Sequence, residues 1–485
     1  MSDIEPLPPI PPRTPRPPLR LKGPLVFVLA GVLLLALCAG LESARMAAQP
    51  WSHALLAPLG QPAIDAAEAI AVQTRRVPAE NYGSILPAIE ENMPSSLLGE
   101  NWEKDRALIA RLESDTPWVV RGPFSNDTLE KLLASGRLPA RGAAEVLAGP
   151  LAELDRFELG GTTFTVVGRF SPRVAAFIQA YVLPADAAHA ALFDEEAGAN
   201  SGYVLPDARG YMDQLREKAR ARLEEAQANT AVVASGMPGV MEMLAMPGRD
   251  LALLGMLALA LVALGAAWAF THTLDWLAAR SANGGAMAVA LHAPGRRRRL
   301  WVSLHLVLYG AFFLSMLAAL VWPGANAALK SWVGVVFSEG GLSYVGRAYA
   351  SGNILQAAVA TFYHNFVTAT LVWNVAVSLV VPFLGLFKTA GSLALVGFAM
   401  APIWSDTFAG YTYHSITMGL EIEAYIVATF SIVVYALHFF RGVVRGAFVR
   451  EMVQGLQTVY GCVLIAAVLL GAAALFEAVT LILFA

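Results

Sequence analysis

The chain has 485 residues, of which 56% are hydrophobic and 15% are charged, with a net charge of −3. Its mean hydropathy of +0.54 is well above the average for soluble proteins and indicates an integral membrane protein. The slight negative charge and the apolar composition argue against nucleic-acid binding.

The N-terminal region combines a Pro-rich tail, 1–23, with an apolar run, 24–42. The tail is typical of a disordered segment, and its basic residues predict a cytoplasmic location. The run predicts a transmembrane signal anchor rather than a cleaved signal peptide, because Glu42 and Arg45 disturb the stretch where a cleavage site would lie. The basic residues of the tail are Arg13, Arg16, Arg20 and Lys22.

Residues 43–250 form the one long polar block, and about 200 residues can bury a core of their own. Runs of β-branched and aromatic residues predict strands at 118–121 and 162–170. Helical patterns occur at 62–75, 100–114, 127–134 and 206–228. We therefore expect an α+β extracytoplasmic domain with an excess of acidic residues.

A second set of apolar runs follows this domain. Segment 251–271 predicts a transmembrane helix, 272–300 a basic cytoplasmic loop, and 301–485 a multi-span membrane domain. The spans expected in the last region are 301–322, 414–440, 457–484 and two crossings within 353–404, with Lys388 between them.

The distribution of Lys and Arg predicts the orientation of these spans, since basic residues accumulate in cytoplasmic loops. The pattern favours about seven transmembrane helices in an α-helical polytopic protein of the inner cell membrane, with the N-terminus in the cytoplasm and residues 43–250 outside. The segment 389–404 is short for a span, and a re-entrant loop is the open alternative.

Part of the polar block resembles a known family. The sequences SGRLPARGAAEVLAGP and FELGGTTFTVVGRFSP, within 135–184, are similar to the periplasmic core domain of macrolide-exporter and cell-division-type ABC permeases. The flanking spans of 24–271 match the architecture of that family. The resemblance implies an ABC-type ATPase as partner, and the chain itself has no G-x-x-x-x-G-K-[ST] sequence for nucleotide binding. An unrelated α+β sensor or binding domain is the alternative.

The region from about 300 to 485 resembles the stage II sporulation protein M family of polytopic membrane proteins. The likeness rests on FYHN at 362–365, TMGLEIEA at 417–424 and ALFEAVT at 474–480. Thr417 occupies the position of a family histidine, and His414 lies one turn away on the same helix face. The resemblance implies a membrane protein of a cell-envelope remodelling complex.

Several ionisable or amide side chains interrupt the predicted spans. Ionisable groups inside a bilayer are costly and normally face a partner or a cavity. Asn365, Glu421 and Glu477 fall at similar depths in the outer leaflet, so we expect an intramembrane polar cluster of these three with His414, and His364 at its rim. Two close carboxylates cannot both ionise cheaply, so one is expected to carry a proton. The alternative is a set of interhelical hydrogen bonds with no transport role.

These patterns lead to two hypotheses of function. The first is a permease-like subunit of a transport or mechanotransmission system that works with a separate cytoplasmic ATPase. The second is a non-transporting scaffold that recruits envelope proteins through the outer domain. The sequence has no H-E-x-x-H, S-x-x-K or G-x-S-x-G motif and no zinc-ligand spacing, so neither an enzyme nor a bound cofactor or metal is predicted.

One further feature concerns partners on the cytoplasmic side. A run of four arginines, whose charge suits anionic membrane lipid or a cytoplasmic partner, precedes the 301–322 span. A plain topology signal is the alternative explanation. The run consists of Arg296, Arg297, Arg298 and Arg299.

Overall fold

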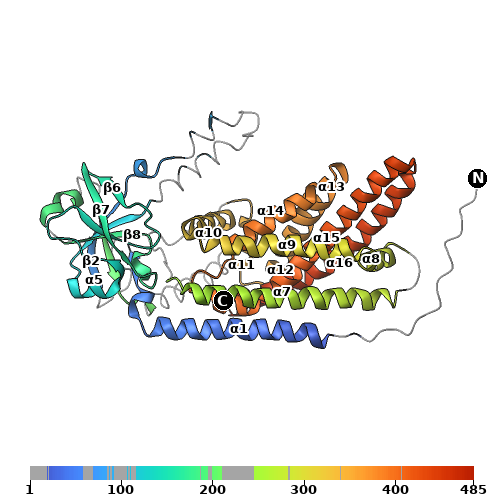
Figure 1. Cartoon of the computed structure of the whole chain (residues 1–485), viewed down its shortest axis with the longest axis horizontal. Helices are drawn as coiled ribbons and strands as arrows, with labels where there is room; N and C mark the ends of the chain where they lie inside the picture. The colour runs from blue at the N-terminus through green and yellow to red at the C-terminus, as the bar shows by residue number, and fades with distance from the viewer. Residues whose placement is uncertain are drawn as a thin grey trace, which may run out of the picture.

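The computed structural model describes residues 19, 21–57, 69–84, 87, 90–91, 106, 110, 116–185, 187–194, 199–209, 245–281, 285–338, 340–405 and 407–484. This part of the chain forms a sheet-containing domain and a bundle of long helices (Figure 1). The sheet domain lies at one end of the bundle. The expected disordered tail lies almost entirely outside the described residues.

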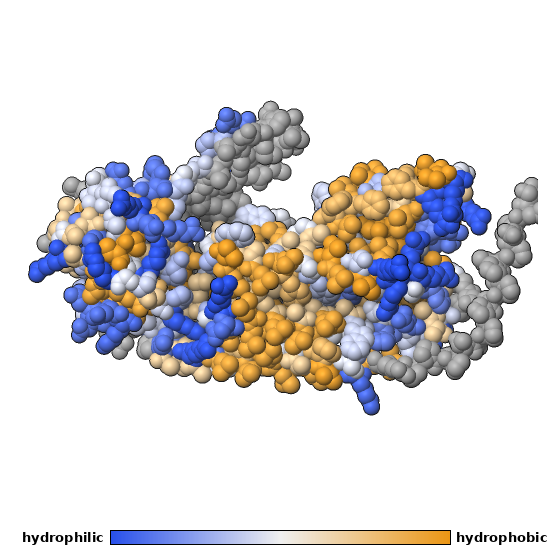
Figure 2. All heavy atoms as spheres, viewed as in Figure 1, coloured by the Kyte–Doolittle hydropathy of each residue, from blue (hydrophilic) through white to orange (hydrophobic). Residues whose placement is uncertain are grey.

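Among the described residues, five helices are long and apolar enough to span a membrane, which is consistent with a multi-pass membrane protein. They are α1 (Lys22–Ala47), α7 (Arg249–Ala278), α9 (Arg298–Ala319), α15 (Thr407–Arg445) and α16 (Phe448–Phe484). Each contains or closely overlaps an apolar run that the sequence marks as a span. Apolar side chains cover the flank of the bundle, and hydrophilic ones cover the sheet domain and the opposite end (Figure 2).

The region 353–404 forms two helical stretches. Helices α12 (Ile354–Phe362), η6 (Tyr363–Ala376, a π-helix) and α13 (Val377–Val380) follow one another without a break. Phe383 then adopts a left-handed conformation with φ 68°, and α14 (Leu384–Ala399) begins at the next residue.

Lys388 therefore lies inside α14, and the expectation that it sits in the turn between two spans is wrong. The turn comes earlier because Phe383 reverses the chain there. The Phe383 ring stacks 6.0 Å from that of Phe440, near the end of α15, and Asn326 donates to the Phe398 carbonyl at the other end of α14.

Three shorter helices connect the long ones: α8 (Gly285–Arg296), α10 (Pro323–Ser338) and α11 (Ser343–Ala350). The segment 272–300 was expected to be a loop. Instead, α7 continues to Ala278 and α8 fills most of the remainder, packing against α16 and α7. A Cβ atom at Gly461 would lie 2.6 Å from the Ala290 Cβ, so α8 and α16 approach closely.

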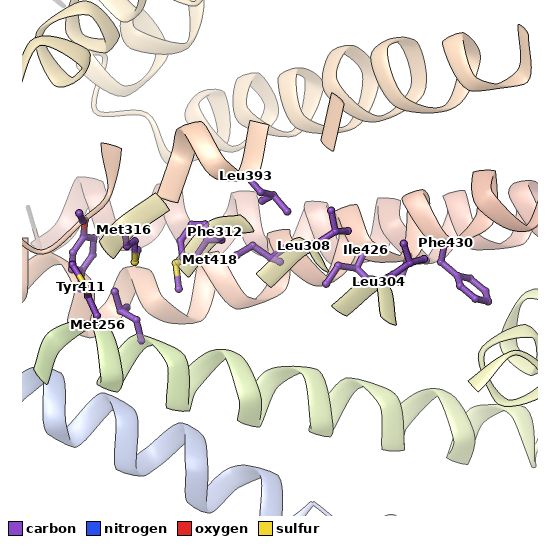
Figure 3. Packing of buried hydrophobic residues seen from close by; sticks show 14 of the residues in the cluster. Met256, Leu304, Leu308, Phe312, Met316, Leu393, Tyr411, Met418, Ile426 and Phe430 are labelled. Carbon is purple, nitrogen blue, oxygen red and sulfur yellow. The ribbon is translucent and has the colours of Figure 1, made fainter. Parts of the chain in front are cut away.

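Helix α15 is the most buried of the five long helices and contacts α1, α7, α9, α14, α16 and η6. On α9, apolar side chains recur every four residues and form one stripe facing this central helix. The side chains labelled in Figure 3 include Leu304, Leu308, Phe312 and Met316 of α9 and Met418, Ile426 and Phe430 of α15.

Helices α1 and α7 pack through glycines. A Cβ at Gly31 would lie 2.6 Å from Val262 Cγ2, and one at Gly265 would lie 2.8 Å from the Val28 nitrogen. Small residues at such contacts let two membrane helices approach backbone to backbone.

In its described residues the sheet domain contains nine strands in the order β1-β9-β2-β3-β8-β5-β7-β4, with β6 paired to β7. The β3–β8 and β5–β7 pairs are parallel and the other pairs antiparallel. The strands are β1 (Leu55–Ala57), β2 (Ile70–Arg76), β3 (Trp118–Gly122), β4 (Leu133–Gly136), β5 (Glu145–Ala148), β6 (Arg156–Leu159), β7 (Thr162–Phe170), β8 (Ala180–Pro184) and β9 (Asn200–Leu205). The described part of the domain also contains helix α5 (Asn126–Leu132) and the 3₁₀ turns η1 (Pro50–His53), η2 (Ala79–Asn81), η3 (Ala175–Phe177) and η4 (Ala187–Phe193).

The strands expected at 118–121 and 162–170 are confirmed as β3 and β7, and α5 confirms most of the helix expected at 127–134. The helix expected at 62–75 is wrong for its described part, which is β2. Strand β2 is held between β3 and β9 by ladders on both sides, and this pairing overrides the local helical pattern. The helices expected at 100–114 and 206–228 lie almost entirely outside the described residues.

The sheet domain is docked onto the bundle through apolar and backbone contacts. Leu151 and Ile178 of the domain belong to the same buried cluster as the core of the bundle. The Met246 nitrogen donates to the Pro172 carbonyl at 2.9 Å, and the Ser405 nitrogen donates to the Ala245 carbonyl at 2.9 Å. The connection between α14 and α15 is therefore bonded to the segment that leads from the domain into α7.

Candidate functional site

A cavity of about 330 Å³ lies among η6, α14, α15 and α16. All five residues that the sequence analysis expected to converge line it. The lining also contains five polar residues that were not assigned to the cluster, among them Lys388 and Thr417. Its polar residues are His364, Asn365, Lys388, Thr389, Ser392, His414, Thr417, Glu421, Tyr425 and Glu477.

The two glutamates of the cavity are held from different sides. Asn365 Nδ2 donates to Glu421 Oε1 at 2.7 Å. The Tyr349 hydroxyl lies 3.0 Å from Thr361 Oγ1 and is close enough to the Glu477 carboxyl to interact with it electrostatically. The carboxyls of Glu421 and Glu477 interact electrostatically, so they act as one acidic pair within the cavity.

The π-helical conformation of η6 positions the residues that enter the cavity from this side. Thr370 Oγ1 donates to the Asn365 carbonyl, five residues earlier, at 2.7 Å. Further along the same helix, Asn374 Nδ2 donates to Thr429 of α15 at 3.2 Å, and Thr429 lies 3.3 Å from Thr389 of α14. These bonds fix η6 against α14 and α15. π-Helical turns of this kind occur often at functional sites.

A second buried polar network, on the other side of α15, was not assigned from the sequence. Glu423 is 2% exposed and accepts a hydrogen bond from the Tyr309 hydroxyl at 2.9 Å. His305 Nε2 lies 3.1 Å from the other carboxylate oxygen, and its Nδ1 lies 2.8 Å from the Trp301 carbonyl. A carbonyl only accepts hydrogen bonds, so Nδ1 of His305 carries a proton. The contact between His305 Nε2 and the Glu423 carboxyl needs one further proton, and the total charge is zero whether the imidazole or the carboxyl carries it. The network is therefore electrically neutral as a whole.

A third network lies near the loop between α15 and α16. Arg297 Nη2 donates to His438 Nε2 at 3.0 Å, and His438 Nδ1 donates to Glu451 at 2.6 Å. An arginine only donates, so His438 is the neutral tautomer that carries its proton on Nδ1. Arg441 adds a longer contact to Glu451 at 3.4 Å.

The arginine run divides into two parts. Arg297 is half-buried in the network with His438, whereas the other three arginines are exposed. They lie on the same side of the bundle as the loop between α15 and α16. Together with the exposed arginines in the adjoining ends of these two helices they form an exposed basic surface, named the basic end below. The basic end consists of Arg296, Arg298, Arg299, Arg441, Arg445 and Arg450.

A buried ion pair joins the sheet domain to the bundle. Glu42, near the end of α1, is 1% exposed and pairs with Arg173 of the domain. Ser405 donates to the same carboxylate oxygen, Oε1. The other oxygen, Oε2, is buried and has no hydrogen-bond partner within the described part of the chain. One carboxylate thus links α1, the sheet domain and the connection that leads into α15.

Sequence reasoning missed Glu42 as a functional residue because its partner Arg173 lies 131 positions away. His305 and Tyr309 were missed although a visible signal existed. They are spaced four residues apart within one apolar run, which places two polar groups on the same helix face.

Comparison with protein-family models, curated proteins and solved structures finds no match for this chain.

Proposed function

We propose that this chain is a permease-like membrane subunit that transmits movement between its outer domain and a separate cytoplasmic ATPase. The observation that carries this proposal is the link formed by Glu42, Arg173 and Ser405. A displacement of the sheet domain pulls on Arg173, and Glu42 passes the force to Ser405. Helix α15 begins two residues later, at Thr407.

Helix α15 is the element through which this force travels. It runs without interruption from Thr407 to Arg445. Along its length it passes the cavity at Glu421 and reaches the basic end at Arg441 and Arg445. Movement of the domain is therefore coupled both to the shape of the cavity and to the surface on which an ATPase docks.

The proposed topology has seven crossings. The five long helices supply five, the uninterrupted helical stretch 354–380 supplies the sixth, and α14 the seventh. At 16 residues, α14 measures about 24 Å, somewhat less than the roughly 30 Å hydrocarbon core. Seven crossings place the basic end and the start of α1 together in the cytoplasm and the sheet domain outside the inner membrane, as the positive-inside rule favours.

The resemblance of residues 135–184 to the periplasmic domain of ABC permeases supports an ATPase of that type as partner. The basic end provides its docking surface, and α8 packs beside it between α7 and α16. The scaffold function implied by the sporulation-family likeness would need no ATPase, so the two hypotheses differ in what binds at the basic end.

The test is affinity purification of the tagged full-length chain from native membranes in mild detergent. We expect an ATPase to co-purify. The double variant Arg299→Glu/Arg445→Glu should lose it, because reversed charges repel the acidic surface that recognises the basic end. The matched control is Arg347→Glu, an exposed arginine in α11 at the outer end of the bundle.

The transmission of movement through Glu42 is tested separately, by the rate of ATP hydrolysis. In the complex, Glu42→Gln should change the rate of ATP hydrolysis, whereas Arg45→Gln should not, since the Arg45–Asp250 pair is exposed and 3.8 Å long. Recovery of an envelope enzyme with no ATPase would refute the permease-like function and support the scaffold.

A further inference from the structure

We infer that the cavity among η6, α14, α15 and α16 binds a small zwitterion, a molecule that carries a primary ammonium group and an anionic group. This inference rests on the proposed function, because it names what the cavity of such a subunit takes. Four features of the cavity support it: an unpaired hydroxyl, an acidic side, a cationic side and the size of the space.

The first observation is the hydroxyl of Thr417. Threonines inside helices normally donate to the carbonyl four residues earlier, and Thr412, Thr458 and Thr480 of α15 and α16 do so. Thr417 is 4% exposed and lines the cavity, yet its Oγ1 has no hydrogen-bond partner among the residues that the structure describes. A buried hydroxyl without a partner costs about 1–3 kcal/mol, so this group is kept free for a ligand.

The acidic side of the cavity is formed by Glu421 and Glu477. Asn365 occupies one oxygen of Glu421, and the Tyr349 hydroxyl interacts electrostatically with Glu477. A carboxylate has about four acceptor sites, so each glutamate keeps acceptor capacity after these interactions. Two interacting carboxyls hold protons more readily than isolated ones, and an ammonium group that binds beside them favours the release of a proton and leaves a negative charge to pair with it. An ammonium group, with its hydrogen-bond donors, is the matching ligand group.

The cationic side is formed by Lys388. Its ammonium can donate three hydrogen bonds, but the one bond found in the described structure is to the Ala369 carbonyl, at the long distance of 3.4 Å. In the part of the chain that the structure describes, no ion pair joins Lys388 to either glutamate of the cavity. A half-buried ammonium that is left unpaired is costly, and an anionic ligand group removes this cost.

The cavity thus presents one positive and one negative group that do not neutralise each other. A metal ion or a simple amine satisfies the glutamates and is repelled by Lys388, and a simple anion is repelled by the glutamates. A zwitterion satisfies both. Ligand pockets for drug-sized molecules begin at about 300 Å³, so a cavity of about 330 Å³ suits a ligand at the small end of that range. The walls at Phe312, Leu393 and Ile422 accommodate a short aliphatic group.

Two sources offer this chemistry, a free amino acid and the headgroup of phosphatidylethanolamine. The experiment separates them with the full-length chain in two kinds of nanodisc, without nucleotide or ATPase. In phosphatidylglycerol nanodiscs, calorimetric titration with L-alanine, methylammonium and acetate is compared. We expect alanine to bind at least tenfold more tightly than either single-charge probe. In mixed nanodiscs, native mass spectrometry measures whether phosphatidylethanolamine is retained in preference to phosphatidylglycerol, which would assign the headgroup as the source.

The variants test the two sides separately. Lys388→Gln should abolish the preference for alanine over methylammonium, whereas Glu421→Gln with Glu477→Gln should abolish binding of both. Thr417→Val, which keeps the shape but removes the hydroxyl, should weaken alanine binding about fivefold, the equivalent of one neutral hydrogen bond. The control is Glu423→Gln, because Glu423 lies on the same helix but faces α9, and it should leave alanine binding unchanged.

The outcomes distinguish the two proposals. Equal binding of alanine and methylammonium would assign a simple cation site and overturn the zwitterion. A folded chain that binds neither alanine nor phosphatidylethanolamine would overturn it as well, with folding checked by thermal unfolding of each variant. Zwitterion binding in a chain that recruits no ATPase would leave this inference standing and refute the proposed function.

Discussion

Glu421 and Glu423 lie two residues apart on α15 and point to opposite sides of it: Glu421 accepts from Asn365 of η6, whereas Glu423 accepts from Tyr309 of α9. Two residues correspond to about 200° around a helix, which explains the opposite directions. Rotation of α15 about its own axis would break both hydrogen bonds at once. The central helix is therefore fixed in its rotational setting by two independent polar networks.

Tyr309→Phe tests the network on the α9 side. The substitution removes the donor to Glu423 and leaves a buried carboxyl oxygen without a partner, which costs about 1–3 kcal/mol. We expect a lower thermal unfolding midpoint for the purified chain. Tyr460→Phe, at a residue of α16 that is 63% exposed, is the control and should leave the midpoint unchanged. Identical midpoints for both variants would show that the network contributes nothing to stability.

Glu42→Gln tests the junction between the domain and the bundle. Removing one partner of a buried ion pair leaves the other charge unpaired, and this costs about 3–5 kcal/mol. We expect the sheet domain to become more sensitive to protease, because its anchor to the bundle is weakened. Arg45→Gln breaks only an exposed pair and should change protease sensitivity little. Equal cleavage rates in the two variants would contradict the role of Glu42 as an anchor.

Two glycines of α14 offer a matched pair for the packing of this helix. A Cβ at Gly397 would collide with the Phe312 carbonyl of α9, whereas a Cβ at Gly391 would meet nothing within 4 Å. Gly397→Ala should therefore push α14 away from α9 and lower the unfolding midpoint. Gly391→Ala should raise it slightly, because alanine is favoured over glycine in a helix by about 1 kcal/mol. Destabilisation by Gly391→Ala alone would contradict the described packing.

We expect His53 to make the stability of the sheet domain depend on pH. Burial, followed by the nearby Arg209, lowers the pKa of its imidazole below the ordinary value of 6.5. The unfolded chain therefore binds a proton at His53 more readily than the folded chain does. The stability that comes from burying the neutral imidazole is fully present above pH 6.5 and is lost as the pH falls below that value. We expect His53→Gln to lose less stability than the unmodified chain between about pH 8 and about pH 5.5. Thermal unfolding at the two values measures this, and equal losses would refute it.

Cysteine labelling tests the seven-crossing topology. The native residues Cys38 and Cys462 are buried, so a membrane-impermeant thiol reagent reports on introduced cysteines. Thr163→Cys in β7 should react from outside the cell, whereas Arg299→Cys and Arg445→Cys should react only after the membrane is opened. If α14 were re-entrant, Arg445→Cys would react from outside while Arg299→Cys would not.

The sequence was most informative where the physical signal was local. Apolar runs long enough to cross a bilayer located the five long helices, and β-branched runs located β3 and β7. The five residues expected at the polar cluster all line one cavity, because the depth of a polar residue within a span follows from its position along the helix.

Other features depended on contacts that no local pattern encodes. The pair of Glu42 and Arg173 exists only after the domain docks on the bundle, and Lys388 enters the cavity only because the chain reverses at Phe383. The helical pattern over β2 gave way to ladders with two distant strands. Thr417 was read as a departure from a family pattern, and its free hydroxyl became visible only from the surrounding side chains.

The length of α15 has a mechanical consequence. Its 39 residues extend over about 58 Å, nearly twice the roughly 30 Å thickness of the hydrocarbon core. In so long a helix a small change of tilt moves the ends far. A tilt of α15 by about 10° displaces one end relative to the other by roughly 10 Å. A slight repacking of side chains around the middle of α15 would thus displace the ends of the helix far enough to alter their contacts with proteins on either side of the membrane.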